Sequence, residues 1–288
     1  MAAKESEMIT PVYNRNKIAL FNCDCVELMS RIPEGFVDLT VTSPPYDSLR
    51  KYEGFSFDVD AVIDGLYRIT KEGGVVVWVV GDATLDWCES CTSFKQALKF
   101  VERGWKLHDT MIYNKTCPTW NVTSRRYRHD FEYMFVFSKG RPKTFNPICD
   151  VKVKNKRPRY GTGHRTVKAT PEFWTPKKDF TVRGNVWRYS VGFCASTTDK
   201  VAFEHPAIFP EELAQDHILS WSNEGDMVFD PFMGSGTTAK MCLLNGRRCI
   251  GAELSMRYCE ISVQRLTDSE SLVPLVTETH EEGGEGQI

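Results

Sequence analysis

Two consecutive prolines, Pro44 and Pro45, follow an apolar run at residues 37–41. The run is β-prone and unbroken, which predicts a buried strand. Proline lacks a backbone N–H and disfavours helical geometry in the residue before it, so the chain must leave this strand in a stiff turn. In open α/β sheets, ligands bind at the carboxyl ends of the strands. The proline turn (residues 43–46) is therefore a candidate ligand site.

The proline turn presents three groups together: the Ser43 hydroxyl, the Pro44 carbonyl and the Tyr46 ring. These groups suit a flat ring with an exocyclic amine, because the two oxygens accept hydrogen bonds from the amine while Tyr46 stacks on the ring. Taken alone, the same four residues are explained equally well as an ordinary turn, since Pro-Pro marks turns in general.

A second motif, the glycine loop (residues 230–238), lies between a predicted strand at 226–229 and a predicted helix at 239–244. Its Gly234-x-Gly236 step lets a ligand approach the backbone closely at a helix N-terminus. Alone it is a weak nucleotide signal, because the full dinucleotide pattern is absent. The next predicted strand, at 248–253, ends in Glu253, and an acid at this point commonly holds ribose hydroxyls.

Together these motifs resemble the DNA amino-methyltransferases, which move a methyl group from S-adenosylmethionine to an exocyclic base nitrogen. The family's catalytic motif, (Asp/Asn/Ser)-Pro-Pro-(Tyr/Phe), matches residues 43–46, and its loop Asp-Pro-Phe-x-Gly-Ser-Gly-Thr matches residues 230–237 without a gap. The catalytic motif comes first, which is the order of the family's β group. The resemblance covers residues 17–266.

The resemblance implies site residues. It makes Ser43, Pro44, Pro45 and Tyr46 catalytic. The cofactor-binding residues that it implies are Asp24, Cys25, Thr42, Phe209, Pro210, Asp230, Pro231, Phe232, Gly234, Ser235, Gly236, Thr237, Thr238, Glu253 and Leu254. Asp24 matches an acid that approaches the adenine of the cofactor; a helix N-cap is the alternative, and both roles can hold.

The expected fold is α/β: a Rossmann-like, seven-stranded, mostly parallel sheet with helices on both faces, one antiparallel edge strand, and an inserted basic target-recognition region. Periodicity predicts a helix over 58–71 that Gly73-Gly74 ends, and a final helix over 256–266. The predicted division is a flexible leader (1–12), a catalytic half (13–139), a target-recognition region (140–200), a cofactor-binding half (201–266) and an acidic, disordered tail (267–288).

Charge is distributed unevenly around a net value of −2. Residues 139–200 hold 15 Lys+Arg against 4 Asp+Glu, whereas residues 267–288 hold 6 Asp+Glu and no Lys or Arg. A basic block in an otherwise acidic chain is the electrostatic footprint expected of a double-stranded DNA partner. The candidate DNA-binding residues are Arg125, Arg126, Lys154, Lys156, Arg157, Arg159 and Arg165. The alternatives are a solvated loop at 115–129 and a disordered insert at 140–200.

Other classes of protein are disfavoured. There is no run of 18 apolar residues and no apolar signal segment at the N-terminus, so neither a membrane span nor secretion is expected. The ten cysteines are scattered, and Cys88-x-x-Cys91 lacks a second pair at zinc-ligand spacing, so no metal is expected. A reduced cytoplasm, in a bacterium or a phage-infected cell, fits best. A homodimer and a cognate restriction endonuclease are further possible partners.

Within the family, Ser-Pro-Pro-Tyr accompanies methylation of cytosine N4 more often than of adenine N6, so the expected activity is site-specific methylation of a flipped cytosine at N4. Adenine N6 is the alternative. C5 chemistry is not expected, because it needs a Cys nucleophile after Pro, and no Pro-Cys pair occurs. A catalytically inactive DNA-binding protein of the same fold is a more remote alternative.

The basic block yields a direct test. If its cations contact phosphates, affinity for DNA should fall steeply with salt, because binding releases counterions. Reversing Lys154, Lys156 and Arg157 to Glu should flatten the slope of log affinity against log salt and leave cofactor affinity unchanged. Fluorescence anisotropy with a labelled duplex measures the slope, and an unchanged slope would move the DNA surface elsewhere.

Overall fold

The computed structural model describes residues 9–45, 57–116, 125–153, 179–192, 196–208 and 210–272. Several predicted site residues lie outside these ranges, namely Tyr46, Phe209, Lys154, Lys156, Arg157, Arg159 and Arg165.

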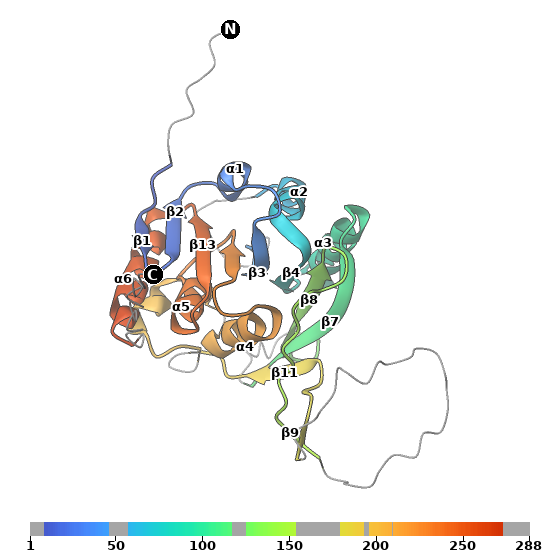
Figure 1. Ribbon diagram of the computed structural model, residues 1–288. Coiled ribbons are helices and arrows are strands. Elements are labelled where there is room, and N and C mark those ends of the chain that lie inside the picture. Colours follow the sequence, from blue (N-terminus) through green and yellow to red (C-terminus); the bar gives the residue numbers. More distant parts are fainter. Residues whose placement is uncertain are drawn as a thin grey trace, which may run out of the picture.

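One large sheet forms the centre of the protein (Figure 1). Its strands, in spatial order, are β1 (Tyr13–Arg15), β2 (Ile18–Asn22), β13 (Arg248–Glu253), β12 (Met227–Asp230), β3 (Val37–Thr42), β4 (Thr70–Val80), β8 (Phe131–Ser138), β7 (Lys106–Lys115) and β11 (Val186–Tyr189). From β2 through β4 every neighbouring pair is parallel, and β11 is parallel to β7. The expected mostly parallel α/β sheet is confirmed.

The sheet differs from expectation in two respects. It has nine strands rather than seven, because the short strands β1 and β11 extend the two edges. The antiparallel strand beside β4 is not at an edge: β8 lies between β4 and β7 and pairs antiparallel with both. The chain reaches β7 first and returns through β8, which leaves β7 free to pair with β11 on its outer side.

Six α-helices cover the two faces of the sheet in the described part of the chain (Figure 1). The helices α1 (Cys25–Arg31), α2 (Val59–Ile69) and α3 (Thr92–Glu102) contribute to one apolar cluster, and α4 (Glu211–Trp221), α5 (Thr237–Leu244) and α6 (Met256–Glu270) contribute to the other. A 3-10 helix, η3 (Lys200–Glu204), precedes α4. Two small hairpins, β5–β6 (Thr84–Leu85 and Cys88–Glu89) and β9–β10 (Val151–Lys152 and Phe180–Thr181), stand apart from the large sheet.

The strand β4 shows why the sequence folds in three layers. Residues 75–80 alternate between the two clusters, with Val75, Val77 and Val79 in one and Val76, Trp78 and Val80 in the other. A strand that is buried on both faces should be apolar without alternation, as the sequence indicates. On β8, alternate residues are aromatic and share one face, and the rings of Tyr133 and Phe135 stack with centroids 5.2 Å apart.

Two predicted boundaries are wrong. Gly73 and Gly74 do not end α2, which ends at Ile69; they lie within β4. A Cβ on Gly74 would come within 2.9 Å of the Asp38 carbonyl oxygen, so this glycine permits close pairing with β3. The tail is not irregular from Thr267, because α6 continues to Glu270, whose carboxylate accepts a 2.7 Å hydrogen bond from the Tyr13 hydroxyl.

The described parts of the predicted recognition region are joined to the large sheet. Within residues 140–200, β11 pairs with β7, and Arg183 binds Asp150 and Asp216, the latter on α4. The domain boundaries themselves stay a prediction. In the described ranges, no helix has the length and apolar character needed to cross a bilayer.

Candidate functional site

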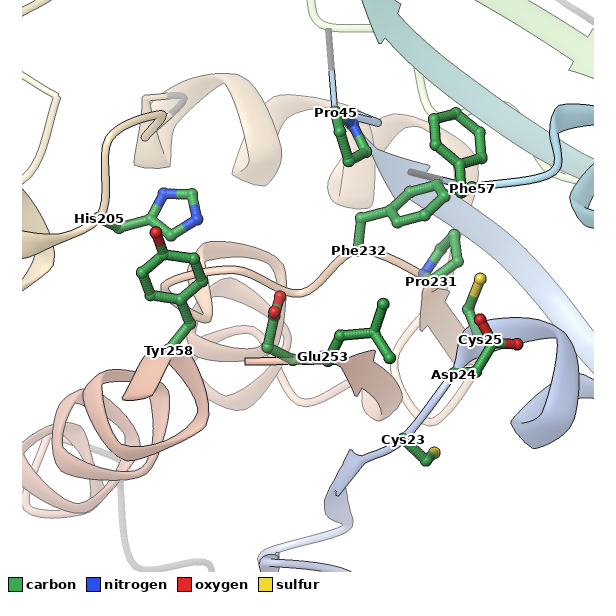
Figure 2. Close-up of a pocket in the computed structure, with 11 residues that line it drawn as sticks. Cys23, Asp24, Cys25, Pro45, Phe57, His205, Pro231, Phe232, Glu253 and Tyr258 are labelled. Carbon is green, nitrogen blue, oxygen red and sulfur yellow. The ribbon is translucent and has the colours of Figure 1, made fainter. Parts of the chain in front are cut away.

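The site lies where four parallel strands end. The strands β2, β13, β12 and β3 are neighbours with the same direction, so their carboxyl ends meet at one edge of the sheet. The pocket at this edge (Figure 2) is lined by Cys23, Asp24, Cys25, Pro45, Phe57, His205, Pro231, Phe232, Glu253, Leu254 and Tyr258. Seven of these residues were predicted; Cys23, Phe57, His205 and Tyr258 were not.

A second pocket adjoins the first and shares Pro45, His205 and Phe232 with it. Its lining residues are Ser43, Pro45, His205, Ala207, Ile208, Phe232, Met233, Gly234, Ser235 and Thr237. The structure therefore brings the proline turn and the glycine loop into one cavity, although they are almost 200 residues apart in sequence.

Asp24 caps α1 and also lines the first pocket, so the helix-cap role and the predicted cofactor-binding role are compatible. One carboxylate oxygen accepts hydrogen bonds from the backbone N–H groups of Val26 (2.8 Å) and Glu27 (3.0 Å). The cysteines on either side remain thiols: burial, assisted by nearby carboxylates, raises the pKa of Cys23 to about 11 and that of Cys25 to about 12. This end of the pocket is thus apolar apart from one carboxylate.

Glu253 lies at the centre of the first pocket, between the Phe232 side and the His205–Tyr258 side (Figure 2). Its two oxygens accept one hydrogen bond each, from the backbone N–H groups of Gly234 and Ser255, both at 2.8 Å. Burial raises the pKa of this carboxyl above its ordinary value, while the backbone donors oppose the shift. Each oxygen accepts from one of these donors and has further acceptor capacity, which suits a pair of ribose hydroxyls.

The two glycines of the loop have different structural roles. Both have positive φ, +53° at Gly234 and +79° at Gly236. A Cβ on Gly234 would come within 3.0 Å of His205 Nε2, on the pocket wall, whereas a Cβ on Gly236 would come within 2.9 Å of Ser262 on α6. A side chain at position 236 would therefore clash with α6, and the role of Gly236 in cofactor binding stays a prediction.

Other predicted cofactor residues lie beneath the loop. Asp230 is 1% exposed and accepts hydrogen bonds from the Thr42 hydroxyl (2.7 Å) and the Phe232 backbone N–H (3.0 Å). Burial raises the pKa of Asp230 to about 6, against the opposing effect of these donors and of Thr238. Among the described residues, the linings of the two pockets do not include Thr42, Pro210, Asp230, Gly236 or Thr238, and the cofactor-binding role of these five residues stays a prediction.

Sequence and structure comparisons agree with this geometry. Residues 37–264 match the N6/N4 family model whose description is DNA methylase. The orphan methyltransferase M.BamHII of Bacillus amyloliquefaciens is 56% identical over 235 residues, which cover 80% of this chain and 88% of the relative. The chain belongs to the N6/N4 DNA methylase family. The family transfers the methyl group of S-adenosylmethionine, so the chain is a DNA methyltransferase with this cofactor.

More distant relatives support the fold of the methyltransferase. The type II methyltransferase M.HpaI of Haemophilus parainfluenzae is 28% identical over 269 residues, covering 86% of this chain and 73% of the relative. The structure of the cytosine-N4-specific PvuII DNA methyltransferase has a TM-score of 0.67 at 20% identity and covers 91% of this chain and 94% of its own. A complex of M1.HpyAVI with S-adenosylmethionine has a TM-score of 0.56 at 22% identity, over 86% and 100% of the two chains.

Two buried cations and two partly exposed carboxylates form a network that holds the glycine loop of the methyltransferase from behind. Arg265, on α6, is 1% exposed and donates to the carbonyl oxygen of Ser235 and to the carboxylates of Asp199 (2.9 Å) and Glu211 (2.6 Å). Lys240, on α5, donates to the same two carboxylates at 2.7 and 2.8 Å. Although burial favours the protonated acid, the two cations hold the pKa of Asp199 below its ordinary value. The network links the loop to η3 and α4.

His205 follows η3 and so depends on this network for its place on the pocket wall. Its Nδ1 accepts a 3.1 Å hydrogen bond from the Ala207 backbone N–H, which places the proton of a neutral ring on Nε2. Its ring meets Tyr258 edge-on, with centroids 4.3 Å apart (Figure 2). No sequence period marks His205, but Tyr258 is on the face of α6 that the helix periodicity buries.

We predict that Arg265 positions the glycine loop for cofactor binding. Arg265→Lys keeps the charge but loses the planar guanidinium, which binds Ser235, Asp199 and Glu211 together. We expect the affinity for S-adenosylmethionine, measured by calorimetry, to fall at least tenfold. Arg257→Lys is the matched control, because Arg257 is on the same helix and, among the described residues, forms an exposed 3.4 Å pair with Glu204, a kind worth about 0–1 kcal/mol. If Arg265→Lys melts earlier yet binds the cofactor normally, the role of Arg265 is only structural.

Proposed function

We propose that the methyltransferase modifies the exocyclic N4 of a cytosine flipped out of double-stranded DNA. The observation that carries the proposal is the placement of Ser43 in one cavity with Gly234, Ser235 and Thr237 of the glycine loop. A base amine at the proline turn would thus face the loop proposed to hold the methionine end of the cofactor. The serine at position 43, where the family also uses Asp or Asn, favours cytosine over adenine.

S-adenosylmethionine supplies an electrophilic methyl group when bound. The residues present fit it: the rings of Phe57 and Phe232 meet edge-on at 4.8 Å beside Asp24, forming an apolar wall suited to adenine, and Glu253 has acceptor capacity for ribose. We assign the methionine end to the pocket that contains Gly234 and Ser235. The backbone N–H groups at the start of α5 suit the carboxylate of that end.

The proline turn would prepare the amine. The lone pair of an aromatic amine is conjugated with its ring, which makes the amine a poor nucleophile. Hydrogen bonds to Ser43 Oγ and the Pro44 carbonyl would favour a pyramidal nitrogen with a localised lone pair. The methylated cation is strongly acidic and can release its proton to water, so a carboxylate at position 43 is not needed. Stacking on Tyr46, which lies outside the described residues, would offset part of the cost of flipping.

The identity of the base has a direct test. DNA methylated by the purified protein should yield N4-methylcytosine after digestion to nucleosides and mass spectrometry. The same digest reports N6-methyladenine, and its appearance without N4-methylcytosine would replace cytosine by adenine as the substrate. No methylated base of either kind on any DNA, with cofactor binding intact, would favour the inactive DNA-binding protein. Homodimerisation and a cognate endonuclease stay predictions.

Substitutions in the proline turn test the mechanism. Ser43→Ala removes one acceptor, and because a single hydrogen bond is worth roughly 1–3 kcal/mol, the rate should fall about ten- to a hundredfold. Tyr46→Ala should cost more, since the flipped base loses its stacking partner as well as its orientation. Both variants should keep cofactor affinity. Single-turnover rates at saturating DNA and cofactor are the measurement; an unchanged rate for Ser43→Ala would reduce Ser43 to a turn residue.

A further inference from the structure

The β5–β6 hairpin carries an exposed tryptophan at its tip. The strands pair Thr84 with Glu89 and Leu85 with Cys88, and the two tip residues, Asp86 and Trp87, have positive φ. The Trp87 side chain is 71% exposed. Large aromatic side chains usually bury most of their surface, so a tryptophan presented on a tight turn needs a partner to account for it.

The base of the hairpin is fixed rather than loose. The carboxylate of Asp82 accepts hydrogen bonds from the backbone N–H of Ser93 (2.9 Å) and from the Ser93 hydroxyl (2.5 Å), at the start of α3. The backbone N–H of Ser90 closes the hairpin on the Ala83 carbonyl at 2.8 Å. Trp87 therefore projects from a short, anchored element.

Arg126 forms hydrogen bonds to the β5–β6 hairpin. Its guanidinium donates to the Trp87 carbonyl at 2.9 Å and lies 3.4 Å from both the Thr84 hydroxyl and the Glu89 carboxylate. The Nε2 atom of His129 lies 3.1 Å from the same Glu89 carboxylate. Arg126 was predicted to contact DNA directly, but the structure uses its donors to hold the Trp87 turn. Its neighbours Arg125, Tyr127 and Arg128 are exposed, Tyr127 by 99%.

The hairpin and residues 125–129 lie at the same end of the strands as the proline turn. In the β3–β4 pair Thr42 is opposite Trp78, so the proline turn leaves β3 where residues 81–85 leave β4. In the β4–β8 pair Val80 is opposite Tyr133, so β8 begins beside the carboxyl end of β4, shortly after residues 125–129. DNA that delivers a base to Ser43 must therefore approach the hairpin and the Arg126 segment.

We propose that the hairpin and residues 125–129 form a duplex-contacting surface, in which Trp87 enters the base stack at the position vacated by the flipped base. The proposal rests on the assignment of the reacting base to Ser43. The exposed cations Arg125 and Arg128 suit phosphates, and Glu89 is neutralised by Arg126. Asp86, at the tip, is repelled by phosphates, which directs the tip towards bases rather than backbone. Base–aromatic stacking is favourable for every base.

The test compares paired and mispaired targets. On a duplex carrying the recognition site, mapped beforehand by sequencing modified plasmid DNA, Trp87→Ala should lower the single-turnover rate at saturating DNA at least tenfold. With the target base mispaired, flipping is easier, and the rate of Trp87→Ala should approach that of wild type. Trp87→Phe should retain most of the rate. Arg126→Ala should behave like Trp87→Ala, because Arg126 is a positioning residue.

Leu107→Ala is the matched control, since Leu107 is 43% exposed and lies on β7 near the opposite end of the strands, where it pairs with Phe137. An equal loss on both duplexes, or no loss, would overturn the proposal. So would a change in sedimentation from dimer to monomer in Trp87→Ala with unaltered methylation, which would make the surface a contact between copies. Ser43→Ala should lower the methylation rate on the paired and the mispaired duplex by the same factor. Failure of the base assignment can therefore be told apart from failure of the role proposed for Trp87.

Discussion

One buried hydrogen bond, from Thr42 to Asp230, joins the two halves of the site. It connects the end of β3 to the end of β12, strands that pair in parallel although they are far apart in the chain. The proline turn follows Thr42 directly and the glycine loop begins at Asp230, so their separation is fixed by strand pairing rather than by loop conformation. Asp230 is 1% exposed at this junction, and its burial raises the pKa of the carboxyl. A carboxylate is retained there because it accepts the donors that shape both turns.

Residues that line the site are fixed by hydrogen bonds to other parts of the protein. Glu253 is fixed by two backbone N–H groups, and Arg265 binds the loop from α6. Arg265 and Lys240 are buried cations, so removing a carboxylate from their network is costly, because a buried charge needs a partner. The shape of the loop is thus supported by contacts from within the protein.

Local patterns predicted most of the fold and the centre of the site. Apolar runs located the strands, the two motifs located Ser43 and the loop glycines, and the acid that ends the last predicted strand located Glu253. What sequence could not supply depended on pairing between distant segments. The position of β8 between β4 and β7 is a choice of neighbour that no periodicity encodes. Arg265 occurs in a polar stretch typical of a solvent-exposed helix face, and Arg126 in a basic loop typical of DNA contact; only the fold shows which carboxylates and carbonyls they meet.

The two cysteines beside Asp24 have a chemical consequence. Cys23 and Cys25 lie at the end of the first pocket that we propose for adenine, and thiolates react with a sulfonium far faster than thiols do. With a pKa of about 11, Cys23 is thiolate in roughly one molecule in ten thousand at pH 7, and Cys25 in fewer. Because burial and the neighbouring carboxylates keep both groups as thiols, this end of the site offers no strong sulfur nucleophile to compete with a base amine for the methyl group.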